Sequence, residues 1–207
     1  GLIKSGTGTL TLHAANTYAG GTTVNAGEVI VDHATALGSG QVVFKSGTEL
    51  TTASAMSVEN TLRLDGNMTL HSLANSTFTG NVSGTGNLTK DGVGTLRLEH
   101  ANTGYTGSIT ISKGGLVVNN NSALGAGQLT LATGTALETA NAVTLANKIQ
   151  LAGDTTLNSV THDSVLEGQI TGVGKLIKEG DGSFTLSKSN SYAGGTLIKA
   201  GTRSEER

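Results

Sequence analysis

The 207-residue sequence predicts an all-β protein that folds as a parallel β-helix, or solenoid, of about nine or ten rungs. Three observations predict this fold: short pairs of alternating apolar residues, an internal duplication that repeats the pairs, and glycines at recurring places between them. No stretch places apolar residues at i, i+3, i+4 and i+7 over three turns, as an amphipathic helix requires. The expected elements are therefore strands and corners.

The apolar pairs predict the strands. Residues at i and i+2 lie on one side of a strand, so an apolar pair bounded by Gly or Asn indicates a short strand with one buried side. The pairs recur in the same order along the chain: Leu10 and Leu12, Thr22 and Val24, Val29 and Val31, Val42 and Phe44; then Leu96 and Leu98, Ile109 and Ile111, Leu116 and Val118, Leu129 and Leu131; then Phe184 and Leu186, Thr196 and Ile198. We expect Leu10, Leu96 and Phe184, each with its partner two residues on, to stack in one ladder.

The duplication sets the length of the repeating unit. Tyr18, Tyr105 and Tyr192 lie 87 residues apart each time, and ALGSGQ at 36–41 returns as ALGAGQ at 123–128. A β-sandwich or a propeller also has short strands, but this period far exceeds one propeller blade of about 40–50 residues, and Asn-Gly hairpin signals are missing. Each unit then holds about four rungs of roughly 20–22 residues.

The repeat also suggests how the chain is divided. Residues 1–201 are expected to be a single β-helical segment of a longer protein, with units 1–86, 87–174 and a partial unit 175–201. Residues 202–207 are expected to be a linker, a tag remnant or a frayed end.

Glycine and asparagine predict the corners, because a tight corner needs a positive φ, which glycine adopts freely and asparagine tolerates. Equivalent residues are expected to share a corner in three sets: Gly27, Gly114 and Gly201; Gly20, Gly107 and Gly194; and Asn16, Asn102 and Asn190. At the third corner the side-chain amide is expected to stack on its counterparts or to bond a turn.

Composition narrows the functional classes. The chain has 31 Gly, no Pro and no Cys, and its formal net charge is −2. The missing cysteines exclude disulfides and thiolate metal sites, and the sequence lacks the basic stripe that a nucleic-acid partner requires. No apolar run reaches the length of about 18 residues that predicts a transmembrane helix. We therefore expect no nucleic-acid partner and no membrane-spanning helix.

Candidate catalytic and metal-binding residues do not cluster. A glycan-active β-helix needs two or three carboxylates on one face, whereas the acids of the first unit and its neighbour are scattered singly: Glu28, Asp32, Glu49, Glu59, Asp65, Asp91 and Glu99. The five histidines have no metal-binding spacing: His13, His33, His71, His100 and His162. We predict no catalytic residue, no cofactor and no metal site.

Two kinds of repeated side chain are candidates for binding. Lys4, Lys90 and Lys178 occupy one position of the unit, and we expect them at solvated corners, too far apart for a dense basic patch. The three equivalent tyrosines would be platforms for sugars if exposed. We expect each ring instead to pack over the corner glycines beside it.

Residues 6–31 resemble the passenger-associated transport repeat of bacterial autotransporters, whose usual form is close to G-x-G-x-L-x-L-x-x-x-N-x-Y-x-G-x-T-x-(V/I)-x-x-G-x-L. Residues 92–118 and 180–201 follow the same pattern with small departures. The resemblance, to passengers of the AIDA-like adhesin type, implies a right-handed β-helical passenger. It also implies export across the outer membrane by a C-terminal translocator barrel, which is absent from this sequence.

The residues and the resemblance together predict a structural and interaction role at the bacterial cell surface or after secretion. We expect a stalk with an adhesive or self-associating surface, where many weak polar contacts add up. The expected partner is a host surface receptor, a glycan or the same passenger on a sister cell. The alternative is an enzyme: either a glycan-active β-helix or the stalk of a passenger with an upstream catalytic domain.

Overall fold

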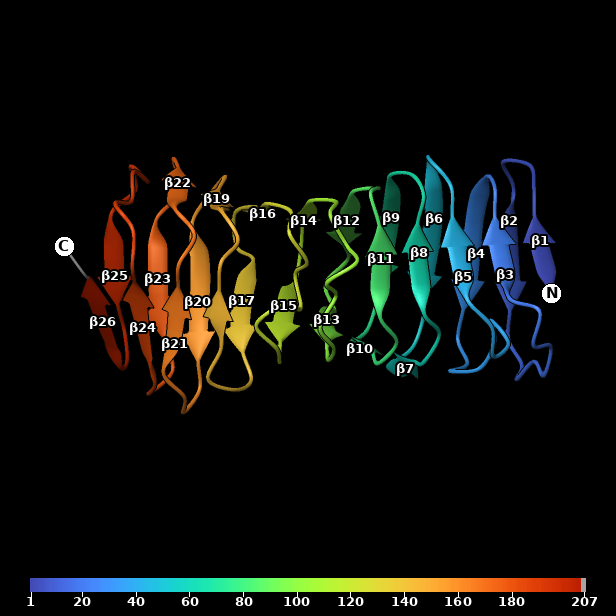
Figure 1. Cartoon of the computed structure of the whole chain (residues 1–207), viewed down its shortest axis with the longest axis horizontal. Coiled ribbons are helices and arrows are strands. Elements are labelled where there is room, and N and C mark those ends of the chain that lie inside the picture. Colours follow the sequence, from blue (N-terminus) through green and yellow to red (C-terminus); the bar gives the residue numbers. More distant parts are fainter. Residues whose placement is uncertain (206–207) are drawn as a thin grey trace.

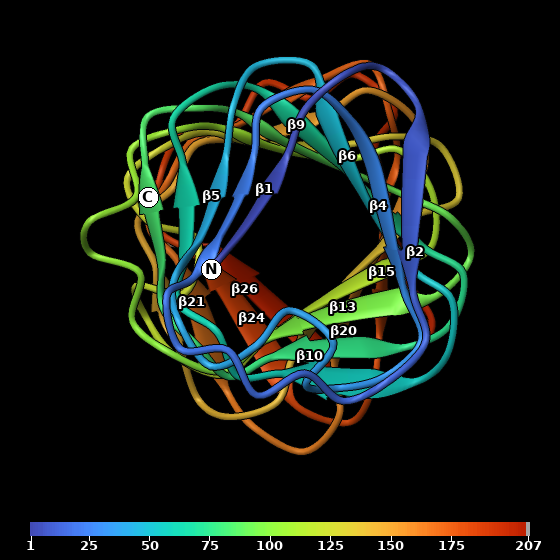
Figure 2. The same cartoon turned by 90° about the vertical axis from the view of Figure 1, so that its right-hand side faces the viewer.

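The computed structural model describes residues 1–205, which form one right-handed parallel β-helix of about ten turns. The predicted fold class is confirmed. Figure 1 shows the turns stacked along the long axis, and in Figure 2 the chain recedes clockwise from its N-terminal end. Register partners in adjacent turns lie 19 to 21 residues apart along the chain. Residues 1–205 contain no helix of the length and apolarity needed to cross a membrane.

Each turn has three faces joined by corners. Face A begins with the sheet β1 (Leu2–Lys4), β3 (Thr22–Val24), β5 (Val42–Phe44), β8 (Leu62–Leu64) and β11 (Val82–Gly84). It resumes as the sheet β18 (Thr144–Leu145), β21 (Ser164–Leu166), β24 (Ser183–Leu186) and β26 (Thr202–Glu205). Face B consists of β2 (Thr9–Leu12), β4 (Gly27–Val31), β6 (Thr48–Thr52), β9 (Met68–Ser72), β12 (Leu88–Asp91), β14 (Ile109–Ile111), β16 (Leu129–Leu131), β19 (Ile149–Leu151) and β22 (Ile170–Gly172). Face C consists of β7 (Met56–Val58), β10 (Ser76–Phe78), β13 (Thr95–Leu98), β15 (Gly115–Val118), β17 (Ala136–Thr139), β20 (Thr155–Ser159), β23 (Leu176–Glu179) and β25 (Thr196–Ile198).

The inward side chains form columns that fill the solenoid. On face B, Leu10, Val29, Leu50, Leu70 and Lys90 are consecutive register partners. Adjacent members of such a column are about 4.8 Å apart, so each side chain packs on its neighbours above and below. The predicted inward positions of the middle unit are all buried, which confirms the i, i+2 interpretation.

The predicted single ladder of Leu10, Leu96 and Phe184 is wrong. Leu10 lies on face B, Leu96 on face C and Phe184 on face A. Four register steps lead from Leu10 to Lys90 on face B, and Leu96 follows on the next face. The repeat therefore winds four turns plus one face, and equivalent residues lie one face further round in each successive unit.

The middle unit interrupts face A over two turns, at residues 102–105 and 123–125, which form no strand. Asn102 bridges the gap, because its Oδ1 accepts a hydrogen bond from Val82 N at 2.7 Å and its Nδ2 donates to Ala123 O at 2.6 Å. The amide therefore bonds the turns on both sides, and this interruption divides face A into two sheets.

Each of the two equivalent asparagines, Asn16 and Asn190, makes one of the two inter-turn hydrogen bonds that Asn102 makes. Asn16 Nδ2 donates to Ala36 O at 2.7 Å, and Asn190 Oδ1 accepts from Ile170 N at 2.7 Å. The prediction that the amide bonds a turn is confirmed. Stacking of the three asparagines is excluded, because the repeat carries them to three different faces.

The predicted corner glycines are of two kinds. Gly27, Gly114 and Gly201 have positive φ values of 73°, 72° and 67°, as predicted, but at three different corners. In the second set, Gly20, Gly107 and Gly194, φ is not positive. Gly107 is required for close approach instead, since a β-carbon there would lie 2.0 Å from Gly86 O. No residue other than glycine has a positive φ in the part of the chain that the structure describes.

The last described residues continue the solenoid. β26 pairs in parallel with β24, with Ser183 opposite Thr202 and Leu186 opposite Glu205. Residues 202–205, expected to belong to a linker, a tag remnant or a frayed end, are paired with β24 in this structure. The remainder of that predicted linker, residues 206–207, lies outside the described residues.

Candidate interaction surface

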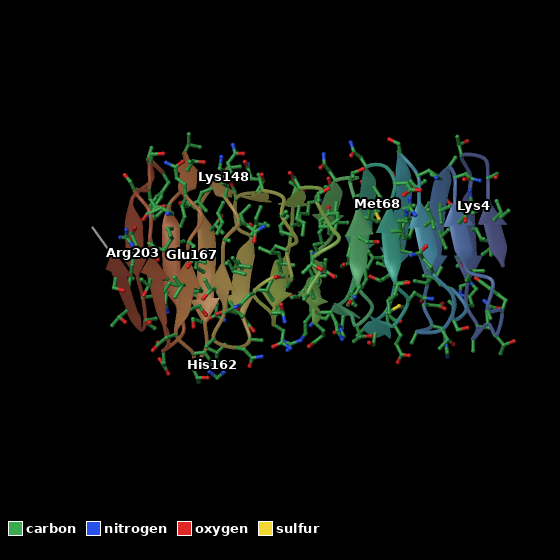
Figure 3. The ribbon with its side chains drawn as sticks, viewed as in Figure 1. Lys4, Met68, Lys148, His162, Glu167 and Arg203 are labelled. Atoms are coloured by element: carbon green, nitrogen blue, oxygen red, sulfur yellow. The ribbon has the colours of Figure 1, made fainter. Side chains whose placement is uncertain are left out.

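The outward side chains form polar rows along the solenoid. On face B one row consists of Thr9, Glu28, Glu49, Thr69, Thr89, Thr110, Thr130, Gln150 and Thr171. Figure 3 shows such side chains along the whole length, and Lys148, His162 and Glu167 among them are exposed. Regular polar rows offer hydrogen-bonding groups to a partner over a long, nearly flat surface.

Face B brings together four ionisable side chains that the sequence did not place side by side. His71 Nε2 lies 3.3 Å from Glu49 Oε2, and His71 Nδ1 lies 3.5 Å from Asp91 Oδ2. Lys113 Nζ, one turn further, is 3.4 Å from Asp91 Oδ1. A hydrogen bond from the backbone of Gly92 and the charge of Lys113 lower the pKa of Asp91.

This charged row has no metal-binding geometry. No group of three or more His, Cys, Asp or Glu side chains that would hold a metal ion occurs among residues 1–205. The ion pairs are partly exposed, so each contributes only about 0–1 kcal/mol to stability. The absence of a catalytic residue, of a cofactor and of a metal site remains a prediction.

The prediction of solvated repeat lysines is wrong, because all three are buried: Lys4, Lys90 and Lys178. The Lys90 side chain points inward in the face B column and is 0 % exposed. Its Nζ donates to Gly92 O at 2.6 Å, to Gly94 O, and to Lys113 O of the next turn at 2.9 Å. The ammonium group therefore ties two successive corners together.

The equivalent lysines make the same contacts on the other faces. Lys4 Nζ donates to Gly6 O at 2.7 Å and to Ala26 O at 2.9 Å. Lys178 Nζ donates to Gly180 O at 2.7 Å and reaches Ala200 O of the next turn at 3.4 Å. These lysines hold the solenoid together and are not available to a partner.

A signal for the buried lysine was present in the sequence. Lys90 follows Leu88 by two residues and so shares its inward side, as Leu98 shares that of Leu96. A lysine at an inward position must satisfy its ammonium group internally, and the Gly-rich corner that follows supplies backbone carbonyls for it.

The tyrosines pack against the solenoid, as predicted. Tyr105 is 1 % exposed, its hydroxyl donates to Ser108 O at 3.0 Å, and burial raises the pKa of that hydroxyl. The Tyr18 ring lies over the following turn, where a β-carbon on Gly38 would be 2.6 Å from ring atom Cδ2. Tyr192 is partly buried against the core. None of the three is an open platform for a sugar ring.

Comparison with known proteins agrees with these features. The sequence pattern of the passenger-associated-transport-repeat family matches residues 2–31, 88–118 and 176–202. Each match begins at a strand that carries a buried lysine: β1, β12 or β23. Over 98% of its length the chain is 38% identical to the adhesin BmaC autotransporter of Brucella suis biovar 1 (strain 1330).

The chain spans 7% of the length of that relative. No solved structure matches the chain. The three family matches begin at residues 2, 88 and 176, in agreement with the 87-residue repeat. The chain therefore belongs to the autotransporter passengers that carry passenger-associated transport repeats.

Proposed function

We propose that this segment is an exported stalk that holds an adhesive or self-associating surface away from the bacterial cell. The observation that carries the proposal is the continuous stack of parallel turns, in which an outward row of face B is polar from Thr9 to Thr171. A stack of about ten turns spaced about 4.8 Å apart extends roughly 48 Å along its axis. Such a rod has little interior room for a substrate and a large area for contact.

The advance of one face per repeat unit also supports this proposal. Because each unit advances by one face, three successive units present the same sequence motif on three different sides of the rod. A partner that recognises the repeat would then be met from every direction, and several weak contacts act together through multivalency. The name of the similar Brucella protein, an adhesin, supports this function.

A non-enzymatic role is part of the proposal. The surface hollows are shallow and open, and the grouped acids on face B pair with a histidine and a lysine. The purified chain is expected to release no reducing ends and no unsaturated products from a panel of surface polysaccharides. Release of either product would favour the glycan-active alternative.

The adhesive role is tested with the full-length protein displayed on a non-adherent bacterium. Deletion of the segment should reduce attachment to host cell monolayers or the settling of the cell suspension, at equal display. Attachment identifies a host receptor or glycan as partner, whereas settling identifies the same passenger on a sister cell. Equal attachment and equal settling with and without the segment would contradict the proposal.

A further inference from the structure

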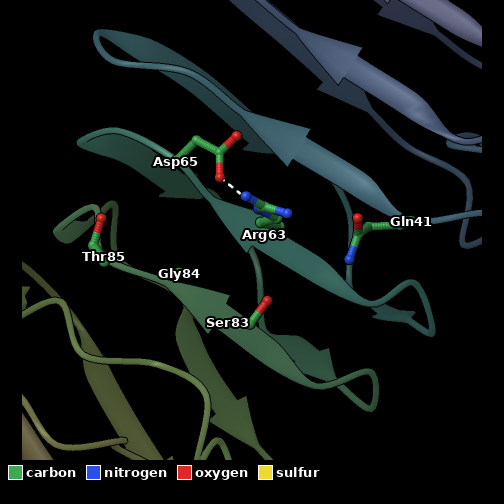
Figure 4. Close-up of a pocket in the computed structure, with 6 residues that line it drawn as sticks. All are labelled: Gln41, Arg63, Asp65, Ser83, Gly84 and Thr85. Atoms are coloured by element: carbon green, nitrogen blue, oxygen red, sulfur yellow. Dashed lines mark hydrogen bonds and ion pairs between the residues drawn. The ribbon is translucent and has the colours of Figure 1, made fainter.

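A hollow of about 380 Å³ opens on face A where the sheet meets the interruption. Figure 4 shows its lining residues: Gln41, Arg63, Asp65, Ser83, Gly84 and Thr85. The Arg63 side chain lies between Asp65 and Gln41 in this view and is 56% exposed. Each side chain in the lining bears a polar group: an amide, two hydroxyls, a guanidinium and a carboxylate.

The hollow arises from a step in an outward row of face A. Val43, Arg63 and Ser83 are register partners, and the bridge from Gly84 to Tyr105 places Gly104 next in the row. Gly104 has no side chain, and a β-carbon on it would lie 3.6 Å from Ser83 Cβ. The surface therefore drops from the long Arg63 side chain to bare backbone within two turns.

The charged residues at this hollow are not repeated in the next unit. In the next unit, 87 residues on, Lys45, Arg63 and Asp65 are replaced by neutral residues: Ala132, Gln150 and Ala152. Gly104 is an insertion between Thr103 and Tyr105 that the other units lack. These residues therefore distinguish the hollow from the equivalent place one unit later, unlike the lysine and the corner glycine, which recur in all three units.

The residues that line the hollow carry one cation, Arg63, and one anion, Asp65, and Lys45 beside the hollow adds a second cation. Lys45 Nζ lies 2.8 Å from Asp65 Oδ2, and Arg63 Nε lies 2.6 Å from Asp65 Oδ1. The hydrogen bonds from Lys45 and Arg63 hold the pKa of the Asp65 carboxyl below its usual value, so Asp65 stays ionised. Two cations share this one carboxylate. The two Nη groups of Arg63 make no hydrogen bond within residues 1–205.

We propose that this hollow binds the carboxylate of an acidic saccharide, a uronate or a sialate, with Arg63 as its main contact. The Nη groups of a guanidinium held at Nε form a planar fork that matches a carboxylate. Gln41, Ser83 and Thr85 supply donors and acceptors for sugar hydroxyls around it. An acidic peptide is a poorer fit, because no aliphatic or aromatic residue lines the hollow to hold an anchoring apolar side chain.

The inference rests on the proposed adhesive function and names the ligand class for it. The test titrates the isotope-labelled 207-residue chain with sialyllactose and with a glucuronate-containing tetrasaccharide, and follows backbone amide shifts. Shifts should concentrate at residues 41, 63–65 and 83–85 and weaken with salt. Lactose and the carboxyl-reduced tetrasaccharide should bind at least about tenfold more weakly.

The matched variants separate charge from fold. Arg63→Gln introduces the residue found one unit later and should weaken binding at least about tenfold with an unchanged melting temperature. Arg97→Gln removes an outward arginine on face C, also paired with a carboxylate, and should leave binding unchanged. Shifts elsewhere, equal binding by Arg63→Gln, or tighter binding of a poly-glutamate peptide would overturn the inference.

Cell attachment distinguishes this inference from the function on which it rests. Bacteria displaying full-length protein with Arg63→Gln should lose attachment that sialidase or uronate lyase treatment of the host surface also abolishes. Retained attachment of this variant refutes the saccharide site but leaves the adhesive function standing. No attachment and no settling with the unaltered protein refutes the adhesive function itself.

Discussion

A β-carbon added to Gly114 would lie 2.7 Å from Lys90 Nζ, the buried ammonium group of the turn before it. The same relationship joins Lys4 to Gly27, at 2.8 Å, and Lys178 to Gly201, at 2.9 Å. In each unit a lysine thus fills the space that its corner glycine leaves open. The lysine and the glycine form one packing contact, repeated on all three faces, that fixes the position of one turn on the next.

Replacing Gly114 by Ala should destabilise the solenoid by about 3 kcal/mol or more. The left-handed φ of 72° costs about 1–2 kcal/mol for a residue with a β-carbon, and that carbon would meet Gly94 O at 2.3 Å. Gly134→Ala is the matched control, because φ there is 75° but nothing lies within 4 Å of the added carbon. Urea unfolding of both variants measures the difference, and equal losses would contradict the close packing of Gly114 against Gly94 O and Lys90 Nζ.

Replacing Lys90 by Met should destabilise the fold by about 2–4 kcal/mol. The apolar side chain fits the column, but the carbonyls of Gly92, Gly94 and Lys113 lose their donor, and an unsatisfied buried group costs about 1–3 kcal/mol. Relief from burying a charge offsets part of this cost. Lys148→Met, at an exposed position, should change stability by less than about 0.5 kcal/mol. Unchanged stability of Lys90→Met would show that the ammonium bonds contribute nothing.

Stability should also depend on pH through Lys90. Burial lowers the pKa of its ammonium group from 10.5 to about 8. Below pH 8 both the folded and the unfolded chain hold this proton, and the charge is a penalty to the fold. Between pH 8 and 10.5 only the unfolded chain holds it, so the penalty is relieved as pH rises, by about 1.4 kcal/mol per unit of pKa shift.

The pH effect is measured as the stability of the unaltered chain minus that of Lys90→Met. Other lysines titrate equally in both proteins, so their contributions cancel. The difference should grow in favour of the unaltered chain from pH 8 to pH 10. A difference that falls over this range would mean that the carbonyl cradle outweighs desolvation and holds the proton on Lys90.

Asn102 should be less tolerant of substitution than its neighbours in the face A interruption. Asn102→Asp keeps the acceptor for Val82 N but places a carboxylate oxygen against Ala123 O, so we expect a loss of about 3 kcal/mol or more. Thr103→Ala, in the exposed part of the same loop, should stay within about 0.5 kcal/mol. Hydrogen exchange should show faster exchange at Val82 N in Asn102→Asp, and unchanged protection there would refute the bridge.

The sequence by itself determined the strands and the nature of the coil. Side chains at i and i+2 share a side of a strand whatever the tertiary structure, so Leu116 and Val118 were recognisable as inward from local pattern alone. The positive φ of Gly114 was likewise predictable, because it follows from local corner geometry. The same parity rule placed Lys90 inward, but a charged residue in that position was interpreted as solvated.

Only the tertiary structure decided which face each repeat occupies and what closes its corners. Register partners are 19, 20 or 21 residues apart, because corners differ in length from turn to turn. Over four turns these differences in length add up to part of a face. The sequence therefore could not show whether one 87-residue unit winds four turns or four turns plus one face. For the same reason the bond from Lys90 to Lys113 O in the next turn and the partners of Asn102 were not predictable. Their hydrogen bonds go to backbone carbonyls and amides, groups that every residue carries, and only the stacking of the turns selects which of these lie within reach.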